Sequence, residues 1–363
     1  MRLGVSAALV GGTFVPGDVE VEEGRLAAFG VASANGRGIA VPGFVDLQVN
    51  GFAGVDFLGA DADAYARAGE ALLETGVTAY LATFITSPED VLVEALRGLP
   101  ADTAGPRVLG AHVEGPFLSA LRLGTHPPEA RRDPDPVLLA RILDAGRVRL
   151  VTLAPELPGA LGLVDQLVGR GVVVSCGHSD ASAVQAEAAF ARGAAAVTHL
   201  FNAMRPFSHR DPGIAGAALT HPGVTVQLIV DGVHLAREAV LLAWSSARGR
   251  VALVTDAVAG AGLGDGSYAL GDVTIEVENG VVRREDGVLA GSALTMVEAI
   301  RNVHRLGVPL EEAVLAASAV PARLLGEPGL GRLEVGLPAD VVVLDDSLEI
   351  VRTVVAGETR VAC

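Results

Sequence analysis

Eight short apolar runs, each followed by a stretch with helical character, set the strongest constraint on the fold of this chain. The runs consist almost entirely of Val, Leu and Ala and do not alternate with polar residues, which is typical of parallel strands buried on both faces. They cover residues 43–49, 78–83, 108–113, 149–154, 172–176, 195–198, 224–230 and 251–255. Helices are expected between them, for example over 62–75, 136–145, 182–192 and 237–246.

Eight strand–helix units in series favour an α/β fold of the (β/α)8 type, a TIM-like barrel expected over residues 42–335. A doubly wound open sheet is the alternative, but no glycine fingerprint for a dinucleotide follows the first run, which argues against it. Residues 268–288 alternate in hydropathy around Asn279-Gly280. This pattern predicts a β-hairpin inserted after the eighth strand.

The two chain ends differ from the middle, because their short strands are separated by Gly and Pro. Strands are expected over 7–10, 19–21 and 26–29 at one end and over 340–344 and 350–355 at the other. Neither set could bury an apolar face alone. We therefore expect residues 1–41 and 336–363 to pair in one small β-sandwich domain.

Charge and composition exclude several classes of protein. The chain carries 43 acidic and 27 basic residues, for a net charge of −16, and such a surface repels nucleic acid and anionic membranes. All 27 of these basic residues are arginines. A chain without lysine excludes Schiff-base aldolases, pyridoxal-phosphate enzymes, P-loop proteins and metal pairs bridged by a lysine carbamate.

The cysteine content and the apolar segments bear on localisation. Cys176 and Cys363 cannot form a disulfide framework, which favours the reducing cytoplasm. The longest uncharged stretch, 212–230, contains two prolines and three glycines and would make a poor membrane helix. Residues 3–15 resemble the apolar part of a signal peptide, but Gly11-Gly12 and the alternating pattern that follows favour strands.

Polar residues stand where several of the apolar runs end, and this is the edge at which a barrel builds its active site. They are Gln48, Asn50, Glu114, His178, His199, Asp231 with His234, and Asp256. Glu114, His178 and His199 together offer one carboxylate oxygen and two imidazole nitrogens. This is a typical ligand set for a catalytic zinc with one open position. Taken singly, each could instead be a core histidine or a helix-capping acid.

Other residues have a chemical and a structural interpretation. Asp256 could move a proton between water and a leaving group, or it could cap the next segment. Arg210 could bind a phosphate or carboxylate, or remain a solvated surface arginine. His126 could donate to a carbonyl oxygen, or serve no chemical purpose in its loop. Cys176, two residues before His178, is better explained by packing than by metal binding.

The motifs resemble one family, the N-acetylglucosamine-6-phosphate deacetylases of the amidohydrolase superfamily. The resemblance spans essentially the whole chain, in order. It is carried by the motifs at 42–51, 112–116, 124–126, 151–156, 177–179, 198–204, 211–213, 231–234, 254–256, 289–296 and 331–340. The sequences His-Val-Glu-Gly-Pro at 112–116 and His-Leu-Phe-Asn-Ala-Met at 199–204 are the most specific.

The resemblance implies a role for each matching position. Glu114, His178 and His199 match the metal ligands, Asp256 the catalytic acid/base, and His126 the group that polarises the acetamide carbonyl. The positions that match substrate contacts are Thr125, Asn202, Ala203, Arg210, Asp231, Gly232, Val233, His234, Leu289, Ala290 and Gly291. The Arg210 and His234 equivalents serve the 6-phosphate of the sugar across a dimer interface, so a homodimer is expected.

Gln48 and Asn50 occupy positions where many amidohydrolases carry two histidines that hold a second metal. Neutral amides are poor ligands for a transition metal, so these are positions for water or a weak second site, and one divalent metal per subunit is expected. Zn²⁺ is the expected ion, with Fe²⁺, Mn²⁺ and Co²⁺ as alternatives. The expected partner is a phosphorylated amino sugar. Three alternatives remain: a related hydrolase for another amide such as a galactosamine phosphate, a sugar-phosphate-binding regulator, and a metal-dependent isomerase.

Overall fold

The structure is a computed structural model, which describes residues 1–32, 35–101 and 105–362. Cys363, one of the two cysteines considered above, lies outside the described residues, and Cys176 is buried as a free thiol. No helix in the described ranges combines the length and the apolar character needed to cross a lipid bilayer.

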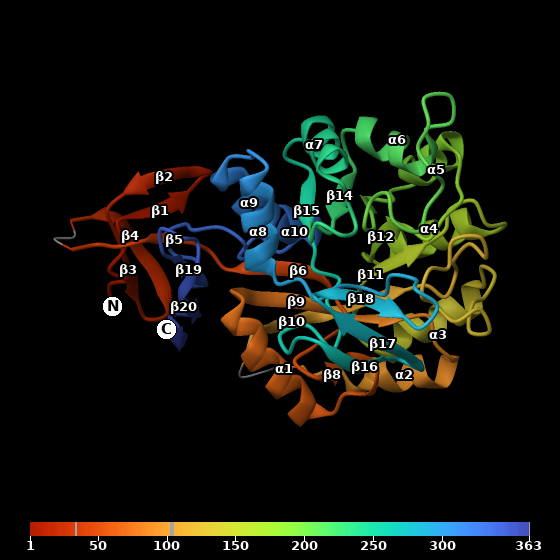
Figure 1. The fold of residues 1–363 in the computed structure, drawn as a ribbon, viewed down its shortest axis with the longest axis horizontal. Coiled ribbons are helices and arrows are strands. Elements are labelled where there is room, and N and C mark those ends of the chain that lie inside the picture. The colour runs from red at the N-terminus through yellow and green to blue at the C-terminus, as the bar shows by residue number, and fades with distance from the viewer. Residues whose placement is uncertain (33–34, 102–104, 363) are drawn as a thin grey trace.

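Eight parallel strands form the central sheet and alternate with helices, as the sequence predicts (Figure 1). The strands are β6 (Phe44–Val49), β9 (Val77–Ile85), β10 (Arg107–Glu114), β11 (Val148–Leu153), β12 (Val173–Cys176), β13 (Ala196–Val197), β14 (Thr225–Leu228) and β15 (Val251–Leu253). The helices are α1 (Ala62–Glu74), α2 (Glu89–Gly98), α3 (Pro136–Ala145), α4 (Ala160–Gly169), α5 (Ala183–Phe190), α6 (Gly213–Thr220), α7 (Arg237–Ser246), α8 (Met296–Arg305), α9 (Leu310–Ala316) and α10 (Ala319–Leu324).

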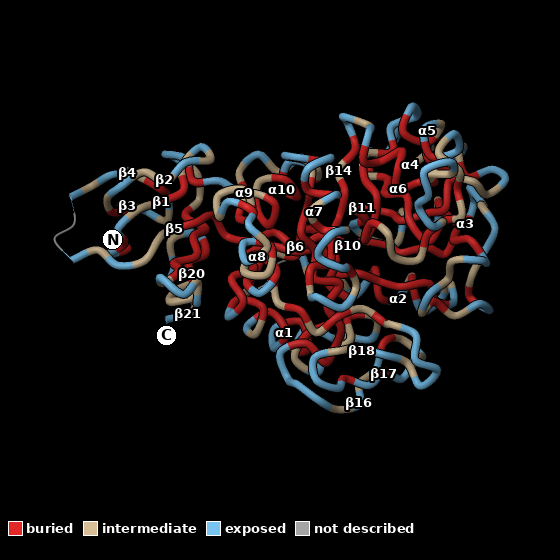
Figure 2. Tube along the Cα trace, turned by 45° about the horizontal axis from the view of Figure 1, so that its top comes forward, coloured by how far each residue is buried: buried red, intermediate tan, exposed pale blue. Residues whose placement is uncertain are grey.

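The sheet runs in chain order from β6 and β9 round to β15, and the two end strands meet again to close the barrel. A parallel bridge joins Val49 to Ala257, and the Asn50 N–H donates to the Ala257 carbonyl at 2.8 Å. Every residue of β6 and β9 is buried, which explains the unbroken apolar runs in the sequence (Figure 2). The (β/α)8 prediction is therefore confirmed, and the open doubly wound sheet is not what forms.

The two ends of the chain lie side by side next to the barrel (Figure 1). A six-stranded sheet has the order β2 (Thr13–Pro16), β1 (Ala7–Val10), β5 (Ile39–Pro42), β19 (Val341–Leu344), β20 (Ile350–Val355) and β21 (Glu358–Ala362). A second sheet of β3 (Asp18–Glu22) and β4 (Arg25–Val31) packs against it through a shared apolar core that includes Val21, Val341 and Val354. The expected pairing of both chain ends is confirmed.

The segment after β15 differs from the expected hairpin, because it forms three antiparallel strands rather than two. These are β16 (Gly266–Leu270), β17 (Val273–Glu278) and β18 (Val281–Arg284). The run expected as one strand breaks at Gly271, which has a φ of +56° and donates its N–H to the Asp56 carboxylate at 2.5 Å. The predicted turn at Asn279-Gly280 does join β17 to β18. The short elements β7 (Gly51–Phe52), β8 (Val55–Asp56) and a 3-10 turn at Phe57–Gly59 complete the described structure.

Candidate active site

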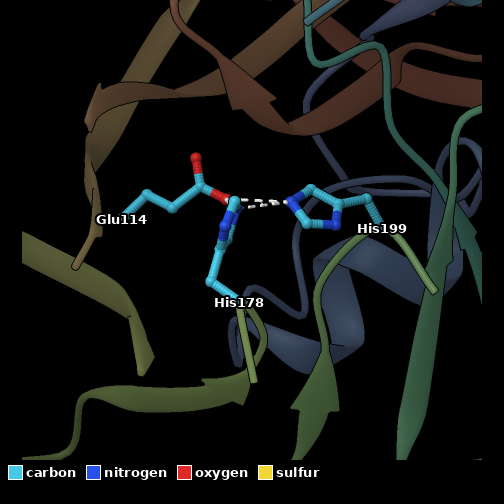
Figure 3. Close-up of side chains that lie close together, drawn as sticks. All are labelled: Glu114, His178 and His199. Carbon is cyan, nitrogen blue, oxygen red and sulfur yellow. Dashed lines mark hydrogen bonds and ion pairs between the residues drawn. The ribbon is translucent and has the colours of Figure 1, made fainter. Parts of the chain in front are cut away.

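Three buried side chains at or just after the ends of β10, β12 and β13 converge on one point (Figure 3). Glu114 is the last residue of β10, and His178 and His199 each follow a strand by two residues. The Nε2 atoms of the two histidines lie 3.0 Å apart. They are 3.2 and 3.1 Å from Glu114 Oε1. The structure thus brings the three predicted ligands together as one group able to hold a cation.

The protonation of His178 shows that this group suits a metal ion. Its Nδ1 lies 2.9 Å from the Arg122 carbonyl oxygen, which only accepts, so Nδ1 carries the proton. Burial lowers the pKa of His178 to about 4, and the ring is therefore neutral near pH 7. Its Nε2 lone pair then faces the Glu114 carboxylate at 3.2 Å. Two electron-pair donors at this separation fit a shared divalent cation.

The charge of Glu114 supports the same conclusion. Burial raises the pKa of its carboxyl, but the interactions with the His126 and His199 side chains outweigh burial and hold that pKa well below its usual value. Gln48 Nε2 also donates to Glu114 Oε1 at 3.2 Å. Glu114 is therefore an ionised carboxylate that faces the two histidines.

Asp256 follows β15 and supplies the second buried carboxylate of the site. Asn50 Nδ2 donates to its Oδ1 at 2.7 Å. Burial raises the pKa of Asp256 to about 6, and the negative charge of Glu114 adds to this effect. A carboxylate with such a pKa can both take up and release a proton near neutral pH.

His126 is held in a defined orientation by Thr86, a residue that the sequence analysis did not single out. The Thr86 N–H donates to His126 Nδ1 at 3.2 Å, and the Thr86 hydroxyl lies 2.9 Å from the same atom. Because Nδ1 accepts, the neutral ring carries its proton on Nε2, which lies 3.6 Å from Glu114 Oε2. Thr86 directly follows β9, so the strand-end argument that found Glu114 would have found it too.

The backbone at the site lies in the left-handed region at several non-glycine residues. His178, His199 and Asp256 have φ values of +48°, +29° and +51°. Non-glycine residues rarely adopt this conformation, and such strain concentrates at functional sites. The sharp turn after each strand places these side chains at the mouth of the barrel.

A cavity of about 270 Å³ opens beside these side chains. Among the predicted site residues, its lining includes Asn50, Glu114, Thr125, His178, His199, Asn202, Ala203, His234, Asp256, Leu289 and Gly291. Leu270 and Val288 also line it, so the segment inserted after β15 contributes to its wall. Gly124, Ile85 and Ile229 complete the lining, and no motif in the sequence marked the four apolar residues Leu270, Val288, Ile85 and Ile229.

Several predicted residues lie behind the lining or outside it. His126 and Gln48 are buried and lie next to Glu114 without lining the cavity, and Ala290 packs in the core under the inserted strands. The Asp231 carboxylate accepts from His234 Nδ1 at 2.7 Å and from the backbone N–H groups of residues 233 and 234 at 2.8 Å. It therefore orients His234, with Gly232 and Val233 in the turn between them. Arg210 is exposed in the loop before α6 and is not part of the lining.

The comparisons with known proteins agree with the fold. The sequence profile of the amidohydrolase family matches residues 39–360. The chain belongs to the amidohydrolase family.

Within that family the chain resembles the deacetylases inferred from its motifs. It is 38% identical to N-acetylglucosamine-6-phosphate deacetylase of Vibrio furnissii over 87% of this chain and 82% of the relative. It is 37% identical to N-acetylgalactosamine-6-phosphate deacetylase of Escherichia coli O157:H7, over 87% and 86%. A variant of N-acetyl-D-glucosamine-6-phosphate deacetylase from Mycobacterium smegmatis, solved with N-acetyl-D-glucosamine-6-phosphate, superposes with a TM-score of 0.94 at 40% identity, covering 100% of this chain and 99% of that one.

Proposed function

We propose that this chain is a metal-dependent hydrolase that removes the acetyl group from N-acetyl-D-glucosamine 6-phosphate in amino-sugar metabolism. The products are D-glucosamine 6-phosphate and acetate. The observation that carries the proposal is the convergence of the Glu114–His178–His199 group with Asp256 at one cavity. It stands in a chain whose similarity to deacetylases of this substrate covers nearly its full length.

One divalent metal, Zn²⁺, is proposed to be held by Glu114, His178 and His199. When bound there, it supplies Lewis acidity that polarises the acetamide carbonyl and acidifies water. Gln48 and Asn50 direct their amide N–H groups to Glu114 and Asp256, which leaves only two neutral amide oxygens, weak ligands for a transition metal, for a second ion. This arrangement supports one metal per subunit, and Fe²⁺, Mn²⁺ and Co²⁺ are the alternatives to test.

Asp256 is proposed to move the proton in both halves of the reaction. Its carboxylate takes a proton from the attacking water, which then adds to the acetamide carbonyl carbon. The same group returns the proton to the sugar nitrogen, because an amine leaves far more readily than an amide anion. His126 directs its Nε2–H toward Glu114 Oε2, and in the complex this proton is proposed to stabilise the carbonyl oxygen as negative charge develops. The Asn50 hydrogen bond keeps the Asp256 carboxyl turned toward the site.

The sugar phosphate is proposed to bind His234 and an arginine from a second subunit. His234 lines the cavity and is oriented by Asp231, whereas Arg210 is exposed and lies outside the lining of its own subunit. An arginine that must reach a phosphate from outside fits a homodimer in which Arg210 crosses the interface. The remaining predicted contacts, Thr125, Asn202, Ala203 and residues 289–291, are proposed to hold the sugar and its acetamide. The proposed location is the cytoplasm.

Mixing two inactive variants tests the crossing of Arg210. A heterodimer of the Arg210→Ala and Asp256→Asn subunits contains one site with an intact Asp256 and an Arg210 from the other subunit. We expect the mixture to recover about a quarter of the wild-type rate per chain, since half of the dimers are mixed and each has one complete site. No recovery, with mixed dimers present, would place Arg210 in its own subunit's site.

Acetate release from N-acetyl-D-glucosamine 6-phosphate tests the reaction itself. We expect turnover in the usual range of about 1–1000 s⁻¹ with zinc-reconstituted protein and none with metal-stripped protein. N-acetyl-D-galactosamine 6-phosphate is the second candidate substrate, because a relative at 37% identity is named for it. Equal or faster turnover of this epimer would reassign the substrate. The unphosphorylated sugar should react at least about 100-fold more slowly, since remote phosphate binding holds the acetamide in place.

A further inference from the structure

The barrel has a seam at which its first and last strands meet beside the active site. Hydrogen-bonded pairing runs from β6 round to β15, and these two strands are the ends of the sheet. Across the seam, the Asn50 N–H donates to the Ala257 carbonyl, and Val49 forms a single bridge with the same residue. Asp256 lies on this seam, immediately before Ala257. Its position therefore depends on how the seam is held.

Asp46, a fully buried residue of β6, holds the other side of the seam. Its Oδ2 accepts the Thr255 hydroxyl at 2.6 Å, and its Oδ1 accepts the N–H groups of Gln48 at 3.2 Å and Thr255 at 3.3 Å. Within the described ranges, no arginine or histidine forms an ion pair with it. A buried carboxylate without an ionic partner is costly, so a shape-matched apolar residue would serve packing better.

Thr255 connects this carboxylate to the backbone of Asp256. Its hydroxyl donates to Asp46, and its carbonyl oxygen accepts the Ser292 hydroxyl at 2.5 Å. On the far side of Asp256, Ala257 is fixed across the seam by Asn50. Asp256 therefore stands between two anchored residues, and its φ of +51° lies in the left-handed region, which a non-glycine residue keeps only where surrounding contacts hold it there.

We propose that Asp46 is a positioning residue that holds the Asp256 carboxylate in its catalytic orientation through the Thr255 hydroxyl. The inference rests on the proposed role of Asp256 as the acid/base. Asp46 does not face the cavity, and its influence passes through its two hydrogen bonds with Thr255, of which the hydroxyl bond is the shorter, and one peptide unit. A role limited to barrel closure would change stability but not the chemical step, and that difference separates the two explanations.

Substitution of Thr255 tests the connection without removing the carboxylate. Thr255→Val keeps the shape of the side chain but removes the hydroxyl, and we expect kcat to fall by about 10- to 100-fold with KM within about twofold of wild type. Thr255→Ser restores a hydroxyl at the same place and should recover most of kcat. Bound metal per subunit should equal that of the wild type in both variants. Asp46→Ala should lower kcat at least as far as Thr255→Val.

Thr353→Val is the matched control. Thr353 is also fully buried and donates its hydroxyl to the Leu73 carbonyl at 2.9 Å, but it lies on β20 in the terminal sheet. It should lower the melting temperature and leave kcat unchanged. If Thr255→Val keeps wild-type kcat, or loses its metal together with kcat, the positioning role is overturned, even if Asp46→Ala does not fold. A wild-type protein that releases no acetate would instead refute the proposed function.

Discussion

The mouth of the barrel and the terminal sheets bury very different side chains. At the mouth, Gln48, Glu114 and Asp256 are almost fully buried, and polar atoms such as Gln48 Oε1 and Asn50 Oδ1 lack a hydrogen-bond partner among the described residues. The core between the terminal sheets is built from Val, Leu and Ala. No buried side-chain polar atom of the described terminal strands is without a partner.

The backbone shows the same contrast. In the terminal sheets, the left-handed non-glycine residues Glu23, Leu348 and Ala356 lie in turns between strands. At the mouth, the left-handed residues include two of the proposed ligands, His178 and His199, and the proposed acid/base Asp256. Buried, incompletely paired polar groups and strained backbone both cost stability. The terminal sheets stabilise the fold by burying apolar side chains. The mouth of the barrel holds chemical groups in place at a cost in the free energy of unfolding.

The largest effect is expected at the mouth of the barrel from Asp256→Asn. This substitution keeps the shape of the side chain but removes its ability to exchange a proton. We expect kcat to fall by about 10³- to 10⁴-fold with substrate binding retained. Acetate release and calorimetric binding of N-acetyl-D-glucosamine 6-phosphate measure the two effects. Near-wild-type kcat would refute the role of Asp256, and Asp346→Asn, at an exposed position, is the control.

The pH dependence of wild-type kcat/KM also tests the role of Asp256. Because the carboxylate form must accept the proton, kcat/KM should fall as the pH drops through the pKa of Asp256, which burial and the charge of Glu114 raise to about 6. A bound cation favours the carboxylate and moves this midpoint lower. The residual rate of Asp256→Asn should lack this acid limb.

A smaller disturbance comes from Gly291→Ala. Gly291 has a φ of +66°, and an added Cβ would lie 2.6 Å from Val258 Cγ1 and 2.7 Å from the Asp256 carbonyl oxygen, so the backbone of the acid/base would have to move together with the Val258 side chain. We expect kcat to fall by about 10- to 100-fold. Gly287→Ala is a matched control, because Gly287 has a φ of +82° but open space around it. Equal kcat losses in both variants would show that backbone strain alone, and not contact with Asp256, is responsible.

Much of this organisation could be predicted from the sequence, because parallel strands buried on both faces give long apolar runs that end in polar residues. The run at 108–113 and the acid at its end predicted β10 and Glu114, and the same argument found His178, His199 and Asp256. The strand and helix ranges that followed from hydropathy agree closely with the structure, as at α3 and α7.

What the sequence could not provide depends on contacts between distant segments. Arg122 acts through its backbone carbonyl on His178, and no side-chain pattern encodes such a contact. The break at Gly271 depends on a hydrogen bond to Asp56, far away in the chain. Asp46 belongs to the motif at 42–51. The sequence does not show, however, that closure of the barrel brings the Thr255 hydroxyl within hydrogen-bond distance of it.

Asp46→Asn tests how much stability the buried carboxylate at the mouth of the barrel costs. Burial raises the pKa of Asp46 from 3.8 to about 7, so between these values the folded protein binds a proton that the unfolded chain does not. The contribution of this group to the free energy of unfolding is therefore lost as the pH rises from about 4 to about 7. The uncharged Asn avoids that loss, and we expect it to stabilise the protein by about 2–4 kcal/mol at pH 8 and by much less at pH 5. Denaturant unfolding at both pH values measures the difference, and an equal effect at both would contradict the burial of an ionised Asp46.

The smallest effect is expected in the terminal core, where Val354→Ala removes methyl groups from a fully buried position on β20. The lost burial and the small cavity should lower the free energy of unfolding by about 1–3 kcal/mol. None of the described residues of the terminal sheets lines the cavity, so kcat and KM should stay at wild-type values. Denaturant unfolding and steady-state kinetics on one preparation provide both numbers. A fall in kcat would mean that the terminal sheets support the geometry of the site through the barrel, and the division between the two regions would no longer hold.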